Sequence, residues 1–238
     1  MRRLPLPAAC LVAGAVAACA EDHPLALKVA TDFPVSRCAF GQSFTLASTN
    51  PWFPINVGRQ WILEGKDQGA LLEVTITVLD ATEVVGGITT RIVREEERSD
   101  GELIELSHNY YAVTNDGTVC YFGESVDIYE GGVVVSHEGA WRADDGDNFP
   151  GVIMPLDPEV GLRFQVEGAP GIAEDQFQVV RRYAVEVAAG PFPEAIRIRD
   201  TNPLDHSVGV KVFALGVGLV IDGPAELTSY SPGTAAAN

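Results

Sequence analysis

Five titratable side chains in the middle of the chain are candidates for acid–base chemistry. His108 and His137 fall in segments that alternate between polar and apolar residues, and Glu124, Glu174 and Asp175 lie in short motifs that contain glycine or follow Pro-Gly. A carboxylate and an imidazole can exchange protons with a substrate when they meet within hydrogen-bond reach. These residues therefore form a candidate polar site. One functional hypothesis is a hydrolase in which one of the three carboxylates works with one of the two histidines.

The strand pattern predicts where the two histidines point. His108 alternates in phase with Leu106 and Tyr110, and His137 alternates in phase with Trp141. Because alternate residues of a strand share one face, both imidazoles are predicted to face the interior. Two inward imidazoles could bind a metal ion or move a proton. The alternative is a pair of hydrogen-bonded core residues.

The neighbouring carboxylates Glu174 and Asp175 cannot face one another. In an extended segment adjacent side chains point to opposite faces, so a dyad would require one of them to meet Glu124 instead. The alternative is a structural role, in which the two carboxylates form an ion pair with Arg181 or Arg182 or belong to a charged turn.

A second candidate site is the acidic turn around Gly146. Asp144, Asp145 and Asp147 place oxygen atoms around a glycine, as calcium loops do. The EF-hand spacing is not met, because the twelfth position counted from Asp144 is Pro155 and not a glutamate. Calcium is therefore a possible ligand of these three aspartates, and the alternative is a solvated hairpin turn. No other cofactor is expected.

The charge of the chain excludes one class of function. The 238 residues include 16 basic and 33 acidic ones, a formal net charge of −17. Such a surface repels nucleic acid and favours cations or basic partners. Nucleic-acid binding is therefore discarded. The sequence also lacks H-x-H, H-E-x-x-H, G-x-S-x-G and P-loop motifs.

The first residues are typical of an exported protein. Arg2 and Arg3 precede an uncharged run that contains two prolines, is too short to span a membrane and ends in Val16-Ala17-Ala18-Cys19. These four residues resemble the lipobox of bacterial lipoproteins, which implies cleavage before Cys19 and lipid attachment to its thiol. The alternative is cleavage after Ala20 and release of a secreted protein.

Two further cysteines remain in the mature chain. Cys38 and Cys120 lie in no C-x-x-C or Cys/His cluster, so a metal site or a reactive thiol is the less favoured interpretation. In an oxidising envelope such a pair most simply forms one disulfide. This bond would tie an irregular N-terminal arm, which carries Phe40 and Phe44, to the rest of the protein.

From Trp61 onward the dominant period is two. Residues 72–78 alternate strictly, and turn signals such as Gly86-Gly87 and Asp100-Gly101 recur about every ten residues. No stretch of 12 or more residues carries a helical stripe. The sequence therefore predicts an all-β protein, an antiparallel meander forming a strongly curved sheet, half-barrel or barrel, with an irregular N-terminal arm. A two-sheet sandwich is the alternative.

Several spaced motifs lie in this β region. They are N-P-x-x-P-x-x-x-G-x-x-W at residues 50–61, Y-F-G-E at 121–124, P-G-V-I-M-P at 150–155 and P-G-I-A-E-D at 170–175. Together with Tyr129 and the G-x-W at residues 139–141, they resemble a group of uncharacterised bacterial envelope lipoproteins over about residues 50–219. The resemblance implies an envelope location and no particular activity. Cys120 stands where the group would carry an aromatic residue, which implies that the disulfide is a local addition.

The expected organisation has four parts: a lipoprotein signal peptide at 1–18, a tether and arm at 19–49, a single β domain at 50–231, and a disordered tail at 232–238. The favoured function is a non-enzymatic cell-envelope protein, attached to the membrane by an N-terminal lipid. We expect it at the outer membrane, where its curved sheet would bind a small apolar ligand or a protein partner. The hydrolase and a divalent-cation-binding module are the alternatives.

Overall fold

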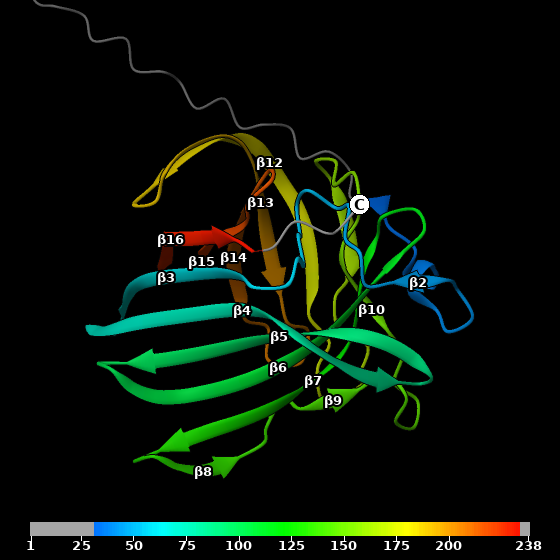
Figure 1. The fold of residues 1–238 in the computed structure, drawn as a ribbon, viewed down its shortest axis with the longest axis horizontal. Helices are drawn as coiled ribbons and strands as arrows, with labels where there is room; N and C mark the ends of the chain where they lie inside the picture. The colour runs from blue at the N-terminus through cyan, green and yellow to red at the C-terminus, as the bar shows by residue number, and fades with distance from the viewer. Residues whose placement is uncertain (1–30, 234–238) are drawn as a thin grey trace, which may run out of the picture.

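The protein is built almost entirely of strands (Figure 1). The computed structural model describes residues 31–233, so the leader, Cys19 and most of the tail lie outside the described residues. The only helix within them is one 3-10 turn, η1 (Val35–Cys38). None of their helical segments has the length and apolar character of a membrane span.

The strands in chain order are β1 (Thr31–Asp32), β2 (Phe44–Thr45), β3 (Arg59–Asp67), β4 (Ala70–Val85), β5 (Ile88–Ser99), β6 (Glu102–Thr114), β7 (Val119–Glu130), β8 (Val133–Ser136), β9 (Trp141–Arg142), β10 (Gly151–Met154), β11 (Leu162–Gln165), β12 (Gln176–Val187), β13 (Gly190–Thr201), β14 (Val208–Ala214), β15 (Gly218–Asp222) and β16 (Ala225–Pro232).

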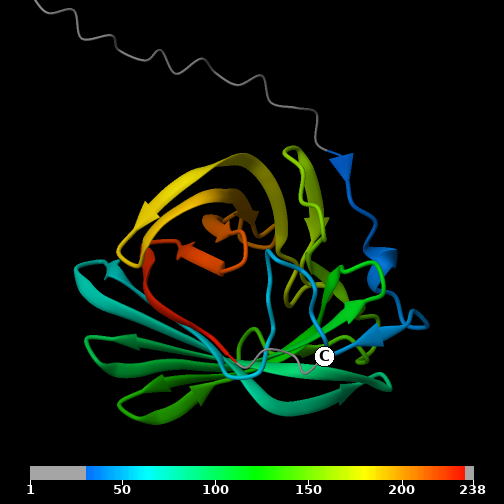
Figure 2. The ribbon, with the colours of Figure 1, turned by 45° about the horizontal axis from the view of Figure 1, so that its top comes forward.

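All strands belong to one sheet that consists of two meanders. The first meander runs from β3 to β7 and the second from β11 to β16, and they are joined where β16 pairs with β3. Neighbouring strands are antiparallel except for β1, which pairs in parallel with β11. Figure 2 shows the second meander arching over the first. The all-β, strongly curved, largely antiparallel sheet predicted from the alternation is thereby confirmed.

The sheet curves back on itself but does not close through strand pairing. Within residues 31–233, no ladder joins β10 to β11, although the segments beside them touch. The Phe149 N–H donates to the Gly168 carbonyl at 2.8 Å. A Cβ on Gly151 would collide with the Val166 carbonyl oxygen, so only glycine allows this close approach of two backbones.

Local turns decide where two of the strands end. The chain stays extended from Val119 to Glu130 and forms the single strand β7. Residues 133–142 instead hold two short strands, β8 and β9, because a turn in which the Ala140 N–H donates to the His137 carbonyl separates them. Periodicity locates strands well, but a local turn between two segments of the same period is harder to predict.

The N-terminal arm covers the outer face of β6 and β7. Phe40 and Phe44 contact Phe122 edge to face, with ring centroids 6.1 Å and 5.2 Å away. Cys38 and Cys120 form a disulfide with their Cα atoms 5.5 Å apart, and both are fully buried. The predicted pairing and its attachment of the arm to the β domain are therefore confirmed.

One motif residue connects distant loops. The buried Asn50 side chain donates through Nδ2 to the carbonyls of Gly117, Met154 and Pro155, at 3.0, 3.2 and 3.1 Å. Its Oδ1 accepts the Trp52 N–H at 2.9 Å. Asn50 therefore satisfies backbone groups that burial would leave without partners. In this structure the asparagine of the N-P-x-x-P motif has a structural role.

Removal of the disulfide should destabilise the protein, because the unfolded chain gains conformational entropy when it is no longer cross-linked. The Cys38→Ala/Cys120→Ala variant releases a loop with a sequence separation of 82, and the loss of free energy of unfolding should be about 4 kcal/mol on the loop-entropy estimate. Urea denaturation measures this loss. A reductant should lower the midpoint of the wild-type protein and leave the variant unchanged. Equal midpoints for the two proteins without reductant would contradict the expectation.

Candidate functional site

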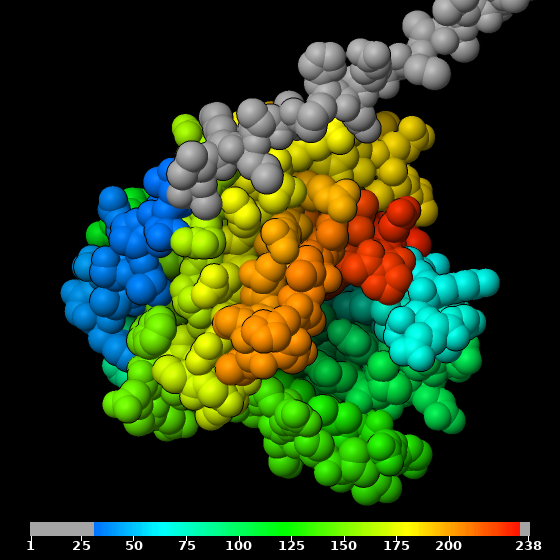
Figure 3. All heavy atoms as spheres, turned by 180° about the vertical axis from the view of Figure 1, so that it is seen from behind, coloured from blue at the N-terminus to red at the C-terminus, as the bar shows by residue number. Residues whose placement is uncertain are grey.

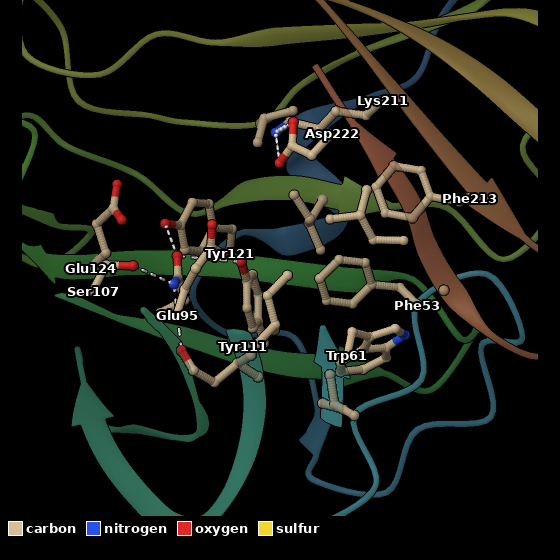
Figure 4. A pocket seen from close by; sticks show the side chains of 18 of the residues that line it. Phe53, Trp61, Glu95, Ser107, Tyr111, Tyr121, Glu124, Lys211, Phe213 and Asp222 are labelled. Carbon is tan, nitrogen blue, oxygen red and sulfur yellow. Dashed lines mark hydrogen bonds and ion pairs between the residues drawn. The ribbon is translucent and has the colours of Figure 1, made fainter. Parts of the chain in front are cut away.

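A cavity of about 220 Å³ lies between the two meanders (Figure 4). One part of its lining is aromatic: Phe53, Trp61, Tyr111, Tyr121, Phe177 and Phe213. Another part is acidic: Glu95, Glu105, Glu124, Glu167, Asp175, Asp200 and Asp222. We call these seven residues the acidic ring. Figure 4 shows Glu95 and Glu124 on the side of Tyr111 and Tyr121, and Phe53, Trp61 and Phe213 together in another part of the cavity.

The acidic ring has many more carboxyl groups than the described lining has basic side chains. Among the described residues that line the cavity, Lys211 is the only basic one. Its Nζ contacts both carboxylate oxygens of Asp222 at 2.7 Å, so this cation is already paired. Although burial opposes it, the attraction of Asp222 raises the pKa of Lys211 above its usual value. The other six carboxyl groups share no further lysine or arginine in this lining.

The strand register explains how these carboxyl groups reach the interior. Glu95 lies opposite Ser107 on β6 and opposite Ile76 on β4, and directly opposite residues share one face of a sheet. The next residue, Glu96, points outward, where it forms ion pairs with Arg94 at 2.8 Å and Arg98 at 3.4 Å. The inner face of β5 and β6 is therefore polar where it borders the cavity.

A bulge in β7 turns Glu124 inward. Tyr111 pairs with Tyr121 and Asn109 pairs with Glu124, so β7 has one residue more than β6 over this interval. Gly123 makes the bulge possible, because its φ is +119° and a Cβ there would meet the Trp141 carbonyl oxygen. Without the extra residue, the alternation from Tyr121 would place Glu124 on the outer face.

A second bulge does the same for Asp222. Phe213 pairs with Leu219 and Lys211 pairs with Asp222, so β15 also has an extra residue relative to its partner strand. Leu219 and Asp222 therefore both face the cavity, although three positions separate them. The two bulges each move a carboxylate from the outer to the inner face.

Asn109 holds the two cavity tyrosines in place. Its Oδ1 accepts the Tyr121 hydroxyl at 2.5 Å and the Tyr111 hydroxyl at 3.5 Å, and its Nδ2 donates to Ser107 Oγ at 3.1 Å. The tyrosine rings stack with centroids 4.8 Å apart. Burial raises the pKa of both tyrosines, so their hydroxyl groups remain neutral. The result is a rigid aromatic wall beside Glu124.

Crowding of carboxyl groups perturbs their acidity. Burial, with the nearby carboxylates of Asp222 and Glu97, raises the pKa of Glu95 to about 8. Burial and Asp175 raise the pKa of Glu167 to about 7, and burial raises the pKa of Asp200 to about 6. A charge taken out of water without a counter-charge favours the neutral form. The acidic ring is therefore partly protonated near neutral pH.

The cavity walls reach a hollow in the molecular surface. Figure 3 shows this hollow where the orange strands near β14, the red β16, the cyan β3 and β4, and the blue-green β5 meet. The same elements carry cavity residues, among them Lys211 on β14, Trp61 on β3 and Glu95 on β5.

The structure does not bring the five predicted polar residues together. Glu124 and Asp175 line the cavity, and His108, His137 and Glu174 do not. His108 lies opposite Ser125, one position out of phase with the inward Asn109 and Glu124. The inward orientation predicted for His108 is therefore wrong, because Ser107 and Asn109, on the opposite face of β6, are the residues that line the cavity. The convergence of carboxylate and imidazole that the hydrolase hypothesis needs is not present among these residues.

His137 and Glu174 have structural contacts outside the cavity. The His137 side chain is 69% exposed and contacts the Val126 carbonyl at 2.8 Å and Asp127 Oδ1 at 2.9 Å, so its predicted inward orientation is also wrong. Glu174 accepts the N–H of Gly171 at 2.8 Å within its own turn. As expected for adjacent residues, Asp175 points the other way, into the cavity.

The acidic turn is organised by an arginine. Asp144 accepts the Gly86 N–H at 2.8 Å and Arg142 Nε at 3.2 Å. Against an opposing effect of burial, these bonds lower the pKa of Asp144. Across residues 31–233, no group of three or more His, Cys, Asp or Glu side chains is arranged to hold a metal ion. Asp144, Asp145 and Asp147 therefore do not form such a group.

The sequence did contain a signal for the missed residues. On β6 the residues Glu105, Ser107, Asn109 and Tyr111 alternate as regularly as the apolar set on the other face. Alternation predicts that the apolar set faces the interior, because that is the usual arrangement in a sheet with one solvent-exposed face. That prediction fails where a sheet encloses a polar cavity.

In comparisons with known proteins, the chain matches no family model, no curated protein and no solved structure. The resemblance to envelope lipoproteins therefore stays a prediction. The candidate site rests on the geometry of the cavity.

Gly123→Ala should disturb the β7 bulge. The substitution combines a positive φ with a collision against the Trp141 carbonyl, so the free energy of unfolding should fall by about 2 kcal/mol or more. Gly131→Ala is the matched control, because its φ is +56° and nothing lies within 4 Å of an added Cβ; there the loss should be about 1 kcal/mol. Urea denaturation measures both, and equal losses would contradict the role of the bulge.

Stability should fall as the pH rises from 5 to 8. Glu95 has a reference pKa of 4.5 and a folded pKa of about 8, so over this interval the folded state keeps a proton that the unfolded chain loses. Each such proton contributes a slope of about 1.4 kcal/mol per pH unit. Glu95→Gln should flatten the slope, and Glu130→Gln, on the exposed end of β7, should not. An unchanged slope in Glu95→Gln would argue against burial of an ionisable group.

Proposed function

We propose that the protein is a binding protein for a small organic cation that has an apolar portion. The observation that supports this is the acidic ring, which shares its cavity with aromatic and aliphatic side chains and in which the one lysine of the described lining, Lys211, is already paired. A positive ligand would supply the counter-charge that the described wall does not. This differs from the apolar ligand expected from the sequence, because the cavity is strongly acidic.

The cavity suits an amine for two physical reasons. Carboxylates in a partly desolvated site attract a cation more strongly than they would in water. Aromatic faces also attract cations and cover the hydrocarbon part of such a ligand. The stacked Tyr111 and Tyr121 stand beside Glu124 and so offer both contacts close together. Binding of a cation would stabilise the ionised carboxylates and release protons.

Binding is a better-supported function than hydrolysis. The described lining contains neither His108 nor His137, which the hydrolase hypothesis needed. The fixed Asn109 network and the half-closed sheet instead provide a preformed cavity, which is typical of small-molecule sites. The hollow in Figure 3 is the proposed entrance, because the strands that border it carry cavity residues.

The proposed location is the cell envelope, with the β domain held at the outer membrane by a lipid on Cys19. The motif before Cys19 and the confirmed disulfide between Cys38 and Cys120 support an oxidising, extracytoplasmic compartment. Native mass spectrometry of protein purified from its own membranes would detect the lipid and a retained ligand together. An uncleaved N-terminus with an unmodified Cys19 would refute the location.

Titration calorimetry at pH 8 with 1-aminohexane and 1-hexanol tests the proposed function. The two probes share a hydrocarbon chain and differ in charge, and the amine should bind at least about tenfold more tightly. Glu95→Gln and Glu124→Gln should each weaken binding of the amine by about threefold or more. Glu96→Gln, next in sequence but on the outer face, should leave it unchanged. Equal binding of amine and alcohol would refute the proposal.

A further inference from the structure

The acidic ring contains more carboxyl groups than one positive charge can neutralise. Six of its members are not paired with Lys211, and they lie on both meanders. Glu95, Glu105 and Glu124 belong to β5, β6 and β7 of the first meander. Asp175 and Asp200, with Glu167, belong to the segment from the end of β11 to β13 of the second. A ligand with a single charge would leave one of the two walls without a counter-charge.

Two carboxyl groups of the second wall have an oxygen atom that lacks a partner. Asp175 Oδ1 and Asp200 Oδ1 are both buried and accept no hydrogen bond from any residue of the described range 31–233. Unpaired buried oxygen atoms are costly and rare in folded proteins. Lys211 acts on both carboxyl groups through its charge, but it donates its hydrogen bonds to Asp222 and none to these two oxygen atoms. These atoms mark the second wall as the place where a positive group is missing.

Apolar side chains line the cavity together with the two acidic walls. Phe177 lies opposite Asp200 in the β12–β13 ladder and lines the cavity, as do Tyr111, Val166 and Ile153. A hydrocarbon chain can be buried there, whereas a charged group in the middle of the ligand would lose its hydration without gaining a partner. Carboxyl groups on both meanders and apolar side chains in the same lining suit a molecule that carries more than one cation on a hydrocarbon chain.

We infer that the cavity binds a linear aliphatic diamine, with one ammonium group at each acidic wall and the methylene chain against the aromatic side chains. This inference rests on the proposed function, because it specifies the class of organic cation. An amino acid fits less well, since its carboxylate would have to compete with Asp222 for Lys211. A bare divalent ion fits less well too, since the described residues offer no cluster of three ligating side chains.

Calorimetry with 1,6-diaminohexane tests the inference against the monoamine of equal length. At pH 8 and low salt, the diamine should bind at least about tenfold more tightly than 1-aminohexane. Calcium chloride is the third probe and should bind at least about tenfold more weakly than the diamine. Similar affinities for the two amines, or for calcium and the diamine, would overturn the inference.

The outcomes separate the inference from the proposed function. If 1-aminohexane binds better than 1-hexanol but no worse than the diamine, the proposed function stands and the diamine is excluded. If neither amine binds, both are refuted. If the diamine binds most tightly and 1-aminohexane binds more tightly than 1-hexanol, both are supported.

Substitutions in the second wall provide an independent test. Asp175→Asn/Asp200→Asn removes two negative charges and keeps the shape, so affinity for the diamine should fall by about tenfold while affinity for 1-aminohexane stays within about threefold. Asp147→Asn, in the exposed turn, is the control and should change neither. Melting curves verify that the variants fold, and the single variants replace the double one if it does not. An equal loss for both amines would overturn the two-walled binding mode.

Discussion

Crowding of like-charged carboxyl groups in one enclosed cavity is the constraint on which the rest of this structure depends. Burial alone disfavours ionisation, and each neighbouring carboxylate adds to the effect, which is why the pKa of Glu95 lies near 8. A fold that contains such a cavity must obtain its stability elsewhere. It does so through an apolar core next to the cavity, an arm that covers the outer face of β6 and β7, and a disulfide.

The same constraint requires a rigid wall, because carboxylates that repel one another would otherwise turn outward to water. Two bulges, at Gly123 on β7 and near Val220 on β15, set the backbone so that Glu124 and Asp222 face inward. Asn109 then fixes the tyrosines beside Glu124 by accepting a hydrogen bond from each hydroxyl group, and it is itself held by donating to the Val93 carbonyl and Ser107 Oγ. Such a preformed site lowers the ordering cost of binding. A cavity that keeps unpaired carboxylates in this way is suited to a cationic ligand.

The limits of sequence reasoning show most clearly at His108 and Glu124. For β6, alternation correctly separated two sets of residues, but it did not identify which set faces inward. For β7, the extra residue of the bulge reverses the phase after Phe122, so counting by twos from Tyr121 misplaces Glu124. Asp175 could be placed opposite to Glu174 by alternation, yet its nearness to Asp200 depends on the β12–β13 register.

The sequence by itself determined the class of fold, most of the strands and turns, and the disulfide, because these follow from local periodicity, glycine-rich turns and a lone pair of cysteines. The tertiary structure decided the pairing of β16 with β3, the position of both bulges and the inward direction of the acidic ring. The physical reason is that a strand presents two faces with the same period. Which face becomes the interior depends on how the whole sheet curves, and that depends on residues far apart in the chain.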